Sequence, residues 1–195
     1  MIRIALVGDI GSGKSYFSKL FKFPVFNADL EVTKIYEKDK NFNKLIKKKF
    51  PYHTFSFPLK KEELIKCILS NPGNLKKISK IVHPIVRKKL NIFLKKNKNK
   101  KYVILDIPLY LENKLQLKND VIVYIDSKNK DVKFRLSKRK SFNNKLIKLF
   151  KKIQLPLLEK KKKSDLIIKN DFTTKKAKRS VKYILTQLRH ERNNT

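Results

Sequence analysis

Four residues near the start of the chain have the types and the spacing that bind phosphate groups. The segment GDIGSGKS covers residues 8–15 and fits the pattern G-x-x-x-x-G-K-[ST] through Gly8, Gly13, Lys14 and Ser15. Glycines let the backbone turn tightly, so that its N–H groups can surround phosphate oxygens. Lys14 would reach the β- and γ-phosphates of a nucleotide, and the Ser15 hydroxyl would hold Mg²⁺. Three of the chain's four glycines lie in this segment, so the match is specific.

A carboxylate further along the chain has the chemistry needed to activate an acceptor. Asp29 ends the segment FPVFNAD, which is typical of a short strand. At the end of a strand beside the phosphate loop, it could accept a proton from an attacking hydroxyl and help to hold the metal. The alternative is that Asp29 caps a helix over residues 30–38.

Two further pairs of residues have a spacing of four, which places each pair on one face of a helix. His83 and Arg87 lie in HPIVR, where Pro84 is expected to start or kink a helix. Arg135 and Arg139 lie in RLSKR, and the planar guanidinium group suits phosphates in a way that lysine does not. The alternatives are a core histidine beside a solvated arginine, and an ordinary solvated helix face.

The elements that position these residues alternate between strands and helices. Apolar runs predict strands at 2–7, 23–29, 102–108, 121–126 and 165–170. Helical patterns cover 14–22, 30–38, 41–50, 60–70, 74–97, 129–140, 143–162 and 173–190. This alternation predicts an α/β protein with a parallel sheet covered on both faces. Ligands of such sheets bind at the carboxyl ends of the strands, which here are followed by Gly8 to Ser15, Asp29, residues 106–112, Asp126 and Asn170.

The charge of the chain is consistent with an anionic ligand but does not select one. The 195 residues carry 50 Lys and Arg against 16 Asp and Glu, a formal charge of +34. Such a field attracts nucleotides, nucleic acid or acidic lipid, yet AT-rich codons would also enrich lysine. Cys67, the one cysteine, excludes an internal disulfide and is expected to be buried. We predict neither a signal peptide nor a membrane span, and therefore a cytoplasmic location.

Other classes of phosphate-loop protein fit less well. The guanine-reading pattern N-K-x-D of GTPases is absent, since Asn129 begins a run that is one residue too short, and no D-x-x-G switch is present. Motor and transport ATPases usually have longer chains. A small kinase acting on a nucleoside monophosphate or an alcohol remains open, as does a basic nucleic-acid-binding protein that binds ATP. Most aromatic residues fall at apolar positions, which disfavours a dedicated RNA reader, so we expect only charge-driven nucleic-acid binding.

From residue 2 to about 170 the motifs, taken in order, resemble those of the dephospho-CoA kinase family. The phosphate loop resembles the family's GGIGSGKS, VFNADL its V-x-D-A-D segment, and HPIVR its HP-x-V-R helix. DIPLYLEN resembles its P-L-L-F-E stretch, RLSKR its paired lid arginines, and SDLIIKN its last strand; Gln154 matches a glutamine after the lid. The chain departs from the family at Asn27, where the first aspartate of D-A-D is expected.

The resemblance implies ATP-dependent phosphorylation of the ribose 3′-hydroxyl of dephospho-CoA, with Mg²⁺. It also implies one P-loop kinase domain, similar to nucleoside monophosphate kinases, with five parallel strands. The core would cover about 1–59, 98–138 and 161–195, with a helical acceptor region at about 60–97 and a lid at about 139–160. Asp29, Lys14 and Arg135 would be catalytic, and Ser15 would bind Mg²⁺, with Asp29 as a second candidate ligand. ATP would contact Gly8, Gly11, Ser12, Gly13, Lys14, Ser15, Tyr16, Arg135, Arg139 and Asn170; the acceptor would contact Asp29, His83, Arg87, Pro108, Leu109 and Glu112.

Overall fold

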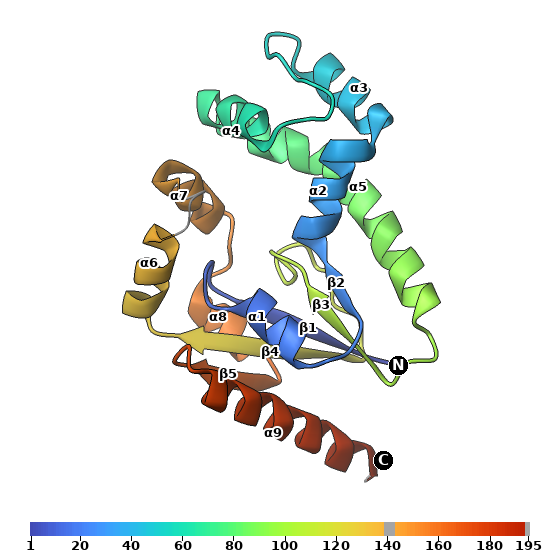
Figure 1. Ribbon diagram of the computed structural model, residues 1–195, viewed down its shortest axis with the longest axis vertical. Helices are drawn as coiled ribbons and strands as arrows, with labels where there is room; N and C mark the ends of the chain where they lie inside the picture. The colour runs from blue at the N-terminus through green and yellow to red at the C-terminus, as the bar shows by residue number, and fades with distance from the viewer. Residues whose placement is uncertain (139–142, 194–195) are drawn as a thin grey trace. The chain divides into compact units, whose positions relative to one another are not determined.

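The structure, a computed structural model, describes residues 1–138 and 143–193. Its elements, in chain order, are β1 (Ile2–Gly8), α1 (Lys14–Leu20), β2 (Val25–Asn27), α2 (Ala28–Lys38), α3 (Lys40–Lys49), α4 (Lys61–Ser70), α5 (Gly73–Lys96), β3 (Tyr102–Asp106), β4 (Asp120–Ser127), α6 (Asn129–Ser137), α7 (Asn144–Lys152), α8 (Leu157–Lys162), β5 (Leu166–Asn170) and α9 (Thr174–Asn193). Figure 1 shows these elements with their labels.

The five strands form one sheet with the order β2-β3-β1-β4-β5. Strand β1 pairs in parallel with β3, where Ile4 lies opposite Ile104, and with β4, where Ala5 lies opposite Ile122. Strand β5 continues the sheet in parallel with β4. The predicted five-stranded parallel sheet is therefore confirmed. Its central strand, β1, leads directly into the phosphate loop.

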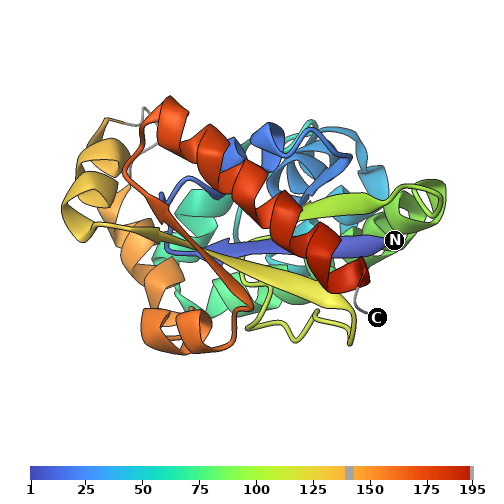
Figure 2. The same cartoon turned by 90° about the horizontal axis from the view of Figure 1, so that it is seen from below.

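The central strands β1, β3 and β4 form because apolar residues, many of them β-branched, cover both of their faces. On one face, strand residues such as Ile4 and Val123 pack against Phe17 of α1 and Ile184 of α9. All four side chains are at most 1% exposed, and burial of each contributes roughly 1.5–3 kcal/mol. Helix α8 contacts β1, and Figure 2 shows α8 and α9 on opposite sides of the sheet.

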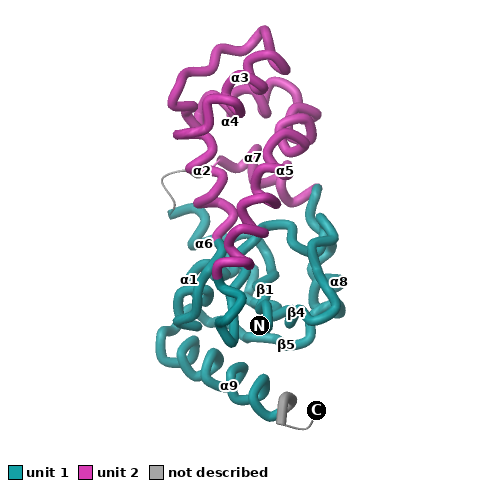
Figure 3. The backbone as a smooth tube through the Cα atoms, turned by 90° about the vertical axis from the view of Figure 1, so that its right-hand side faces the viewer, with its two compact units in different colours: residues 1–26, 97–142, 153–195 teal, residues 27–96, 143–152 magenta. Residues whose placement is uncertain are grey.

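The chain divides into two compact units, which Figure 3 colours separately. The first contains residues 1–26, 97–142 and 153–195, and therefore the phosphate loop. The second contains residues 27–96 and 143–152, with a core of its own built from helices α2 to α5 and α7. Cys67 lies in that second core, fully buried as predicted.

The helix predicted at 74–97 is confirmed as α5, which runs from Gly73 to Lys96 and continues through Pro84, so that Pro84 does not start a helix. The single helical region predicted at 143–162 is two helices, α7 and α8, because Pro156 lacks an N–H and stands immediately before α8. The cap of α2 is Asn27 rather than Asp29, since the Asn27 side chain accepts a hydrogen bond from the N–H of Leu30. Among the described residues, no helix is long and apolar enough to cross a membrane.

Candidate active site

The phosphate loop is the turn between β1 and α1, and its glycines are required by the space around them. Gly13 has a φ of 100°, and a Cβ added there would lie 2.8 Å from Nδ2 of Asn170. A Cβ added at Gly8 would lie 2.7 Å from the backbone oxygen of Ile125. The backbone therefore passes too close to the ends of β4 and β5 for any side chain at these two positions.

Ser12 is held from both of these strand ends. Its backbone oxygen accepts one hydrogen bond from the Ser127 hydroxyl at 3.0 Å and another from Nδ2 of Asn170 at 2.8 Å. The Ser12 hydroxyl is buried and has no hydrogen-bond partner among the described residues. An unsatisfied buried hydroxyl is costly, so its presence in this loop fits a site completed by an oxygen-rich anion.

The side chains that follow the loop are positioned for a nucleotide. The Lys14 ammonium donates to the backbone oxygens of Gly8 at 3.3 Å and Asp9 at 2.8 Å, so it lies folded over the loop. Ser15 and Tyr16 are both exposed on the first turn of α1. The first N–H groups of any helix have no partner within the helix, so this turn offers donors and a positive dipole to an anion.

Helix α6 closes one side of the loop and carries the predicted lid arginine. A Cβ at Gly11 would lie 3.0 Å from the Leu136 side chain, so α6 packs directly on the loop. One residue earlier, the Arg135 guanidinium carbon lies 4.5 Å from the centre of the Phe172 ring. This stacking gives the guanidinium group a fixed plane. Arg139, its predicted companion, lies outside the described residues.

The turn after β3 contains the predicted acceptor residues Pro108, Leu109 and Glu112. Leu109 has a φ of 58°, a left-handed conformation uncommon for a residue with a side chain. The Glu112 carboxylate accepts a hydrogen bond from the Leu155 N–H at 3.0 Å and forms an ion pair with Lys160 at 2.8 Å. Glu112 is therefore a structural link between this turn and the segment that leads into α8.

In the second unit, Asp29 lies in the first turn of α2 and is exposed. A carboxylate in this position is favoured by the positive end of the helix dipole. Its charge acts on Tyr36, whose pKa rises to about 12 because of burial and, secondly, because of the Asp29 carboxylate. With Asn27 serving as the cap, Asp29 is not needed to begin the helix.

His83 and Arg87 interact on α5, as their spacing predicts. Burial lowers the pKa of His83, and the positive charge of Arg87 lowers it further. Both effects favour the neutral form of the imidazole. Arg87 is exposed and lies on one face of α5 together with Pro84, Lys88, Asn91, Ile92 and Lys95.

Within the first unit, the structure brings the phosphate loop, Asn170 and Arg135 together. Sequence reasoning missed Ser127, Phe172 and Lys160, which hold the Ser12 carbonyl, Arg135 and Glu112 respectively. Ser127 and Phe172 closely follow the predicted ends of strands, so an inspection of every residue at those ends would have found them. Nothing in the sequence distinguishes Lys160 from its neighbours.

A strand, a glycine-rich loop ending in lysine and serine, and a helix form this site at the carboxyl edge of a parallel sheet. These features define the P-loop class of nucleotide-binding proteins. The family model for dephospho-CoA kinase matches residues 2–176. The chain belongs to the dephospho-CoA kinase family.

Known relatives agree with this assignment. The chain is 35% identical to a dephospho-CoA kinase from a Wolbachia species of Brugia malayi over 190 residues, 95% of this chain and 97% of the relative. Among solved structures, TT1252 from Thermus thermophilus has a TM-score of 0.74 at 24% identity and covers 96% of this chain and 97% of its own. A dephospho-CoA kinase from Campylobacter jejuni has a TM-score of 0.63 at 24% identity, with full coverage of both chains. The two alternatives, another small kinase and a nucleic-acid-associated ATP-binding protein, are not favoured.

Proposed function

We propose that this protein transfers the γ-phosphoryl group of ATP to the ribose 3′-hydroxyl of dephospho-CoA, giving ADP and CoA. The observation that carries the proposal is the match of residues 2–176 to the dephospho-CoA kinase family. A phosphate loop with the spacing and the glycine conformations that phosphate binding requires supports it.

On the donor side, the backbone of the phosphate loop and the Ser12 hydroxyl would bind the phosphates of ATP. Lys14 would exchange its two backbone acceptors for phosphate oxygens, and Arg135 would neutralise charge on the group being transferred. The Ser15 hydroxyl would hold Mg²⁺, with Asp29 as a second candidate ligand. When bound, Mg²⁺ would offset the negative charge of the ATP phosphates.

On the acceptor side, Asp29 would accept the proton of the 3′-hydroxyl. A bond forms between the ribose oxygen and the γ-phosphorus, while the bond from that phosphorus to the β–γ bridging oxygen breaks and ADP leaves. His83 and Arg87 would shape the acceptor site, together with Pro108 and Leu109. Glu112 would act through its contacts to residues 155 and 160.

In this proposal, residues 60–97 serve the acceptor, and a lid over about 139–160 closes on ATP. The ATP contacts predicted for Tyr16, Asn170 and Arg139 belong to the same proposal. A cytoplasmic location stays a prediction made from the sequence.

The test is steady-state kinetics of an Asp29→Asn variant with Mg-ATP and dephospho-CoA. Loss of a general base lowers kcat by about 10²–10⁴-fold, while the KM for ATP should change little. Glu37→Gln removes an exposed carboxylate from the same helix and is the matched control. An Asp29→Asn enzyme with the kcat of the wild type would refute the role of Asp29 as the base.

A further inference from the structure

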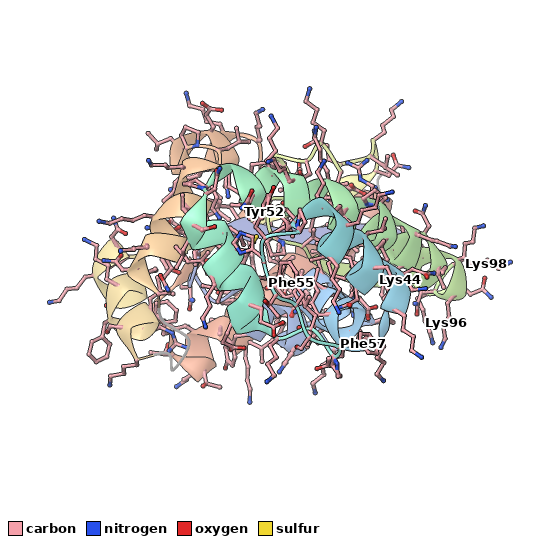
Figure 4. All side chains as sticks on the ribbon, turned by 90° about the horizontal axis from the view of Figure 1, so that it is seen from above. Lys44, Tyr52, Phe55, Phe57, Lys96 and Lys98 are labelled. Carbon is pink, nitrogen blue, oxygen red and sulfur yellow. The ribbon has the colours of Figure 1, made fainter. Side chains whose placement is uncertain are left out.

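The loop between α3 and α4 exposes two aromatic rings that the proposed kinase reaction does not use. Tyr52 is 97% exposed and Phe57 is 42% exposed, whereas Phe55 between them is buried at 3%. Figure 4 shows Tyr52 and Phe57 on this loop and Lys44 on α3. Exposed rings such as these are available to stack on the flat faces of a ligand.

The part of the loop around Phe57 is held in place, since hydrogen bonds tie its backbone on both sides of this residue. The backbone oxygen of Ser56 accepts a hydrogen bond from Nδ2 of Asn43 on α3 at 2.7 Å. The Glu63 carboxylate accepts from the N–H of Ser56 at 3.0 Å and from the N–H of Lys60 at 3.2 Å. Partial burial raises the pKa of Glu63, but these hydrogen bonds hold it below its usual value, so the acceptor stays ionised.

Positive charge predominates in the segment that carries the two rings, although the Glu63 carboxylate lies beside Ser56. Residues 40–61 contain no Asp or Glu and seven lysines: Lys40, Lys44, Lys47, Lys48, Lys49, Lys60 and Lys61. Lys40, Lys44 and Lys47 follow a spacing of four and three, so they share one face of α3, and all three are exposed. We call Lys40, Lys44, Lys47, Tyr52 and Phe57 the aromatic–basic surface.

We propose that the aromatic–basic surface binds single-stranded nucleic acid without sequence preference. Lysines would pair with the phosphates, and the rings of Tyr52 and Phe57 would stack on bases. A single strand fits better than a duplex, because its bases expose the π-faces on which aromatic side chains stack. A fixed loop adds to affinity, because little conformational entropy is lost when the rings bind. This site is independent of the phosphate loop and goes beyond the charge-driven binding expected from the sequence.

Exposed aromatic rings next to lysines also occur on membrane-binding surfaces. Such surfaces insert a wide apolar face with many large side chains. The aromatic–basic surface has only two rings, five residues apart, within a predominantly cationic setting. This arrangement suits bases along a strand better than a lipid interface, so an anionic vesicle serves as a competing probe in the test.

The test is fluorescence anisotropy of a labelled oligouridylate of about 12 nucleotides, within the usual site size, titrated with the full-length protein in the absence of ATP. The double variant Tyr52→Ala and Phe57→Ala should weaken binding by about tenfold or more, because stacking is lost while the charge is kept. Tyr183→Ala is the matched control: Tyr183 is 59% exposed on α9, beside Arg179 and Lys182, and its loss should change nothing. Circular dichroism of each variant checks that the fold is intact.

A second pair of variants separates local charge from total charge. Lys44→Gln with Lys47→Gln should reduce the slope of log affinity against log salt by about 1.4, since each single-strand phosphate contact contributes about 0.7. Lys175→Gln with Lys178→Gln, on exposed positions of α9, should leave that slope unchanged. The proposal would be overturned, in favour of binding spread over the whole surface, if both pairs of lysine variants reduced the salt slope equally. The same conclusion would follow if the Tyr52/Phe57 and Tyr183 variants lost RNA affinity equally. The proposal would also be overturned, in favour of a membrane surface, if the variant with Tyr52→Ala and Phe57→Ala lost binding to phosphatidylserine vesicles but kept the RNA affinity of the wild type.

Discussion

The buried ion pair between Glu112 and Lys160 allows a quantitative prediction. The two side chains are 10% and 4% exposed, and the Lys160 ammonium lies 2.8 Å from Oε1 of Glu112. Glu112→Gln keeps an oxygen for the Leu155 N–H but removes the negative charge, so that the ammonium is buried without a counter-charge. Breaking a buried pair on one side costs about 3–5 kcal/mol. We expect the free energy of unfolding to fall by that amount.

The measurement is urea unfolding followed by circular dichroism, because the chain contains no tryptophan. Lys161→Met is the matched control: its pair with Asp126 has the similar separation of 2.9 Å, but the side chains are 42% and 34% exposed. Screening by water limits such a pair to about 0–1 kcal/mol.

A double variant guards against the possibility that Glu112→Gln alone does not fold. Adding Lys160→Met to Glu112→Gln removes the unpaired charge and should restore most of the lost stability, because a buried pair can often be replaced by apolar side chains without loss. A free energy of unfolding that falls no more for Glu112→Gln than for Lys161→Met would contradict this prediction.

Three further predictions concern the phosphate loop, the arginine on α6 and the histidine on α5. Gly13→Ala forces a Cβ toward Asn170 at a φ of 100°. We therefore expect the free energy of unfolding to fall by about 1–3 kcal/mol and the KM for ATP to rise. An unchanged KM for ATP would contradict this prediction. Arg135→Ala should lower kcat by roughly 10³-fold. Phe172→Leu should lower kcat less, because the guanidinium remains but loses its stacking ring; a Phe172→Leu enzyme with the kcat of the wild type would be evidence against a role for this stacking. The pKa of His83 lies below its ordinary value of 6.5, so the unfolded state binds more protons, and stability should fall as the pH drops through about 6.5. In His83→Gln, the urea midpoint should therefore vary less with pH between about pH 5 and 7. A pH dependence equal to that of the wild type would contradict a lowered pKa of His83.

The parts of the fold that were predicted from the sequence have local signals. An apolar run ending in glycine is enough to predict β1, which extends only one residue beyond the predicted 2–7. The helix after the phosphate loop follows from the loop pattern itself. Parallel pairing then follows from the alternation of strands and helices, because parallel strands need a crossover between them.

Helix ends were harder to predict, because several residues compete for each end. Asn27 and Asp29 are both good caps, and only the structure shows that Asn27 takes this place. Pro84 should disfavour a helix interior, yet the buried residues Val82 and Leu90 on either side hold α5 together. Packing of a helix face outweighs the loss of one backbone hydrogen bond.

Pairing between distant side chains could not be predicted at all. Lys160 belongs to a run of four lysines at 160–163, and the lysine that pairs with Glu112 depends on how α8 packs. The stacking of Arg135 on Phe172 joins residues 37 positions apart. The abundance of lysine also hid the aromatic–basic surface, since the charge is similar elsewhere and only the exposure of Tyr52 distinguishes it.

The most direct test of the central claim is mass spectrometry of the products formed from Mg-ATP and a mixture of dephospho-CoA, nucleoside monophosphates and shikimate. We expect that only dephospho-CoA gains one phosphoryl group, that the group is on the ribose 3′-oxygen, and that ADP appears in equal amount. Phosphorylation of a nucleoside monophosphate or shikimate in place of dephospho-CoA, or ADP release without any phosphorylated acceptor, would contradict it.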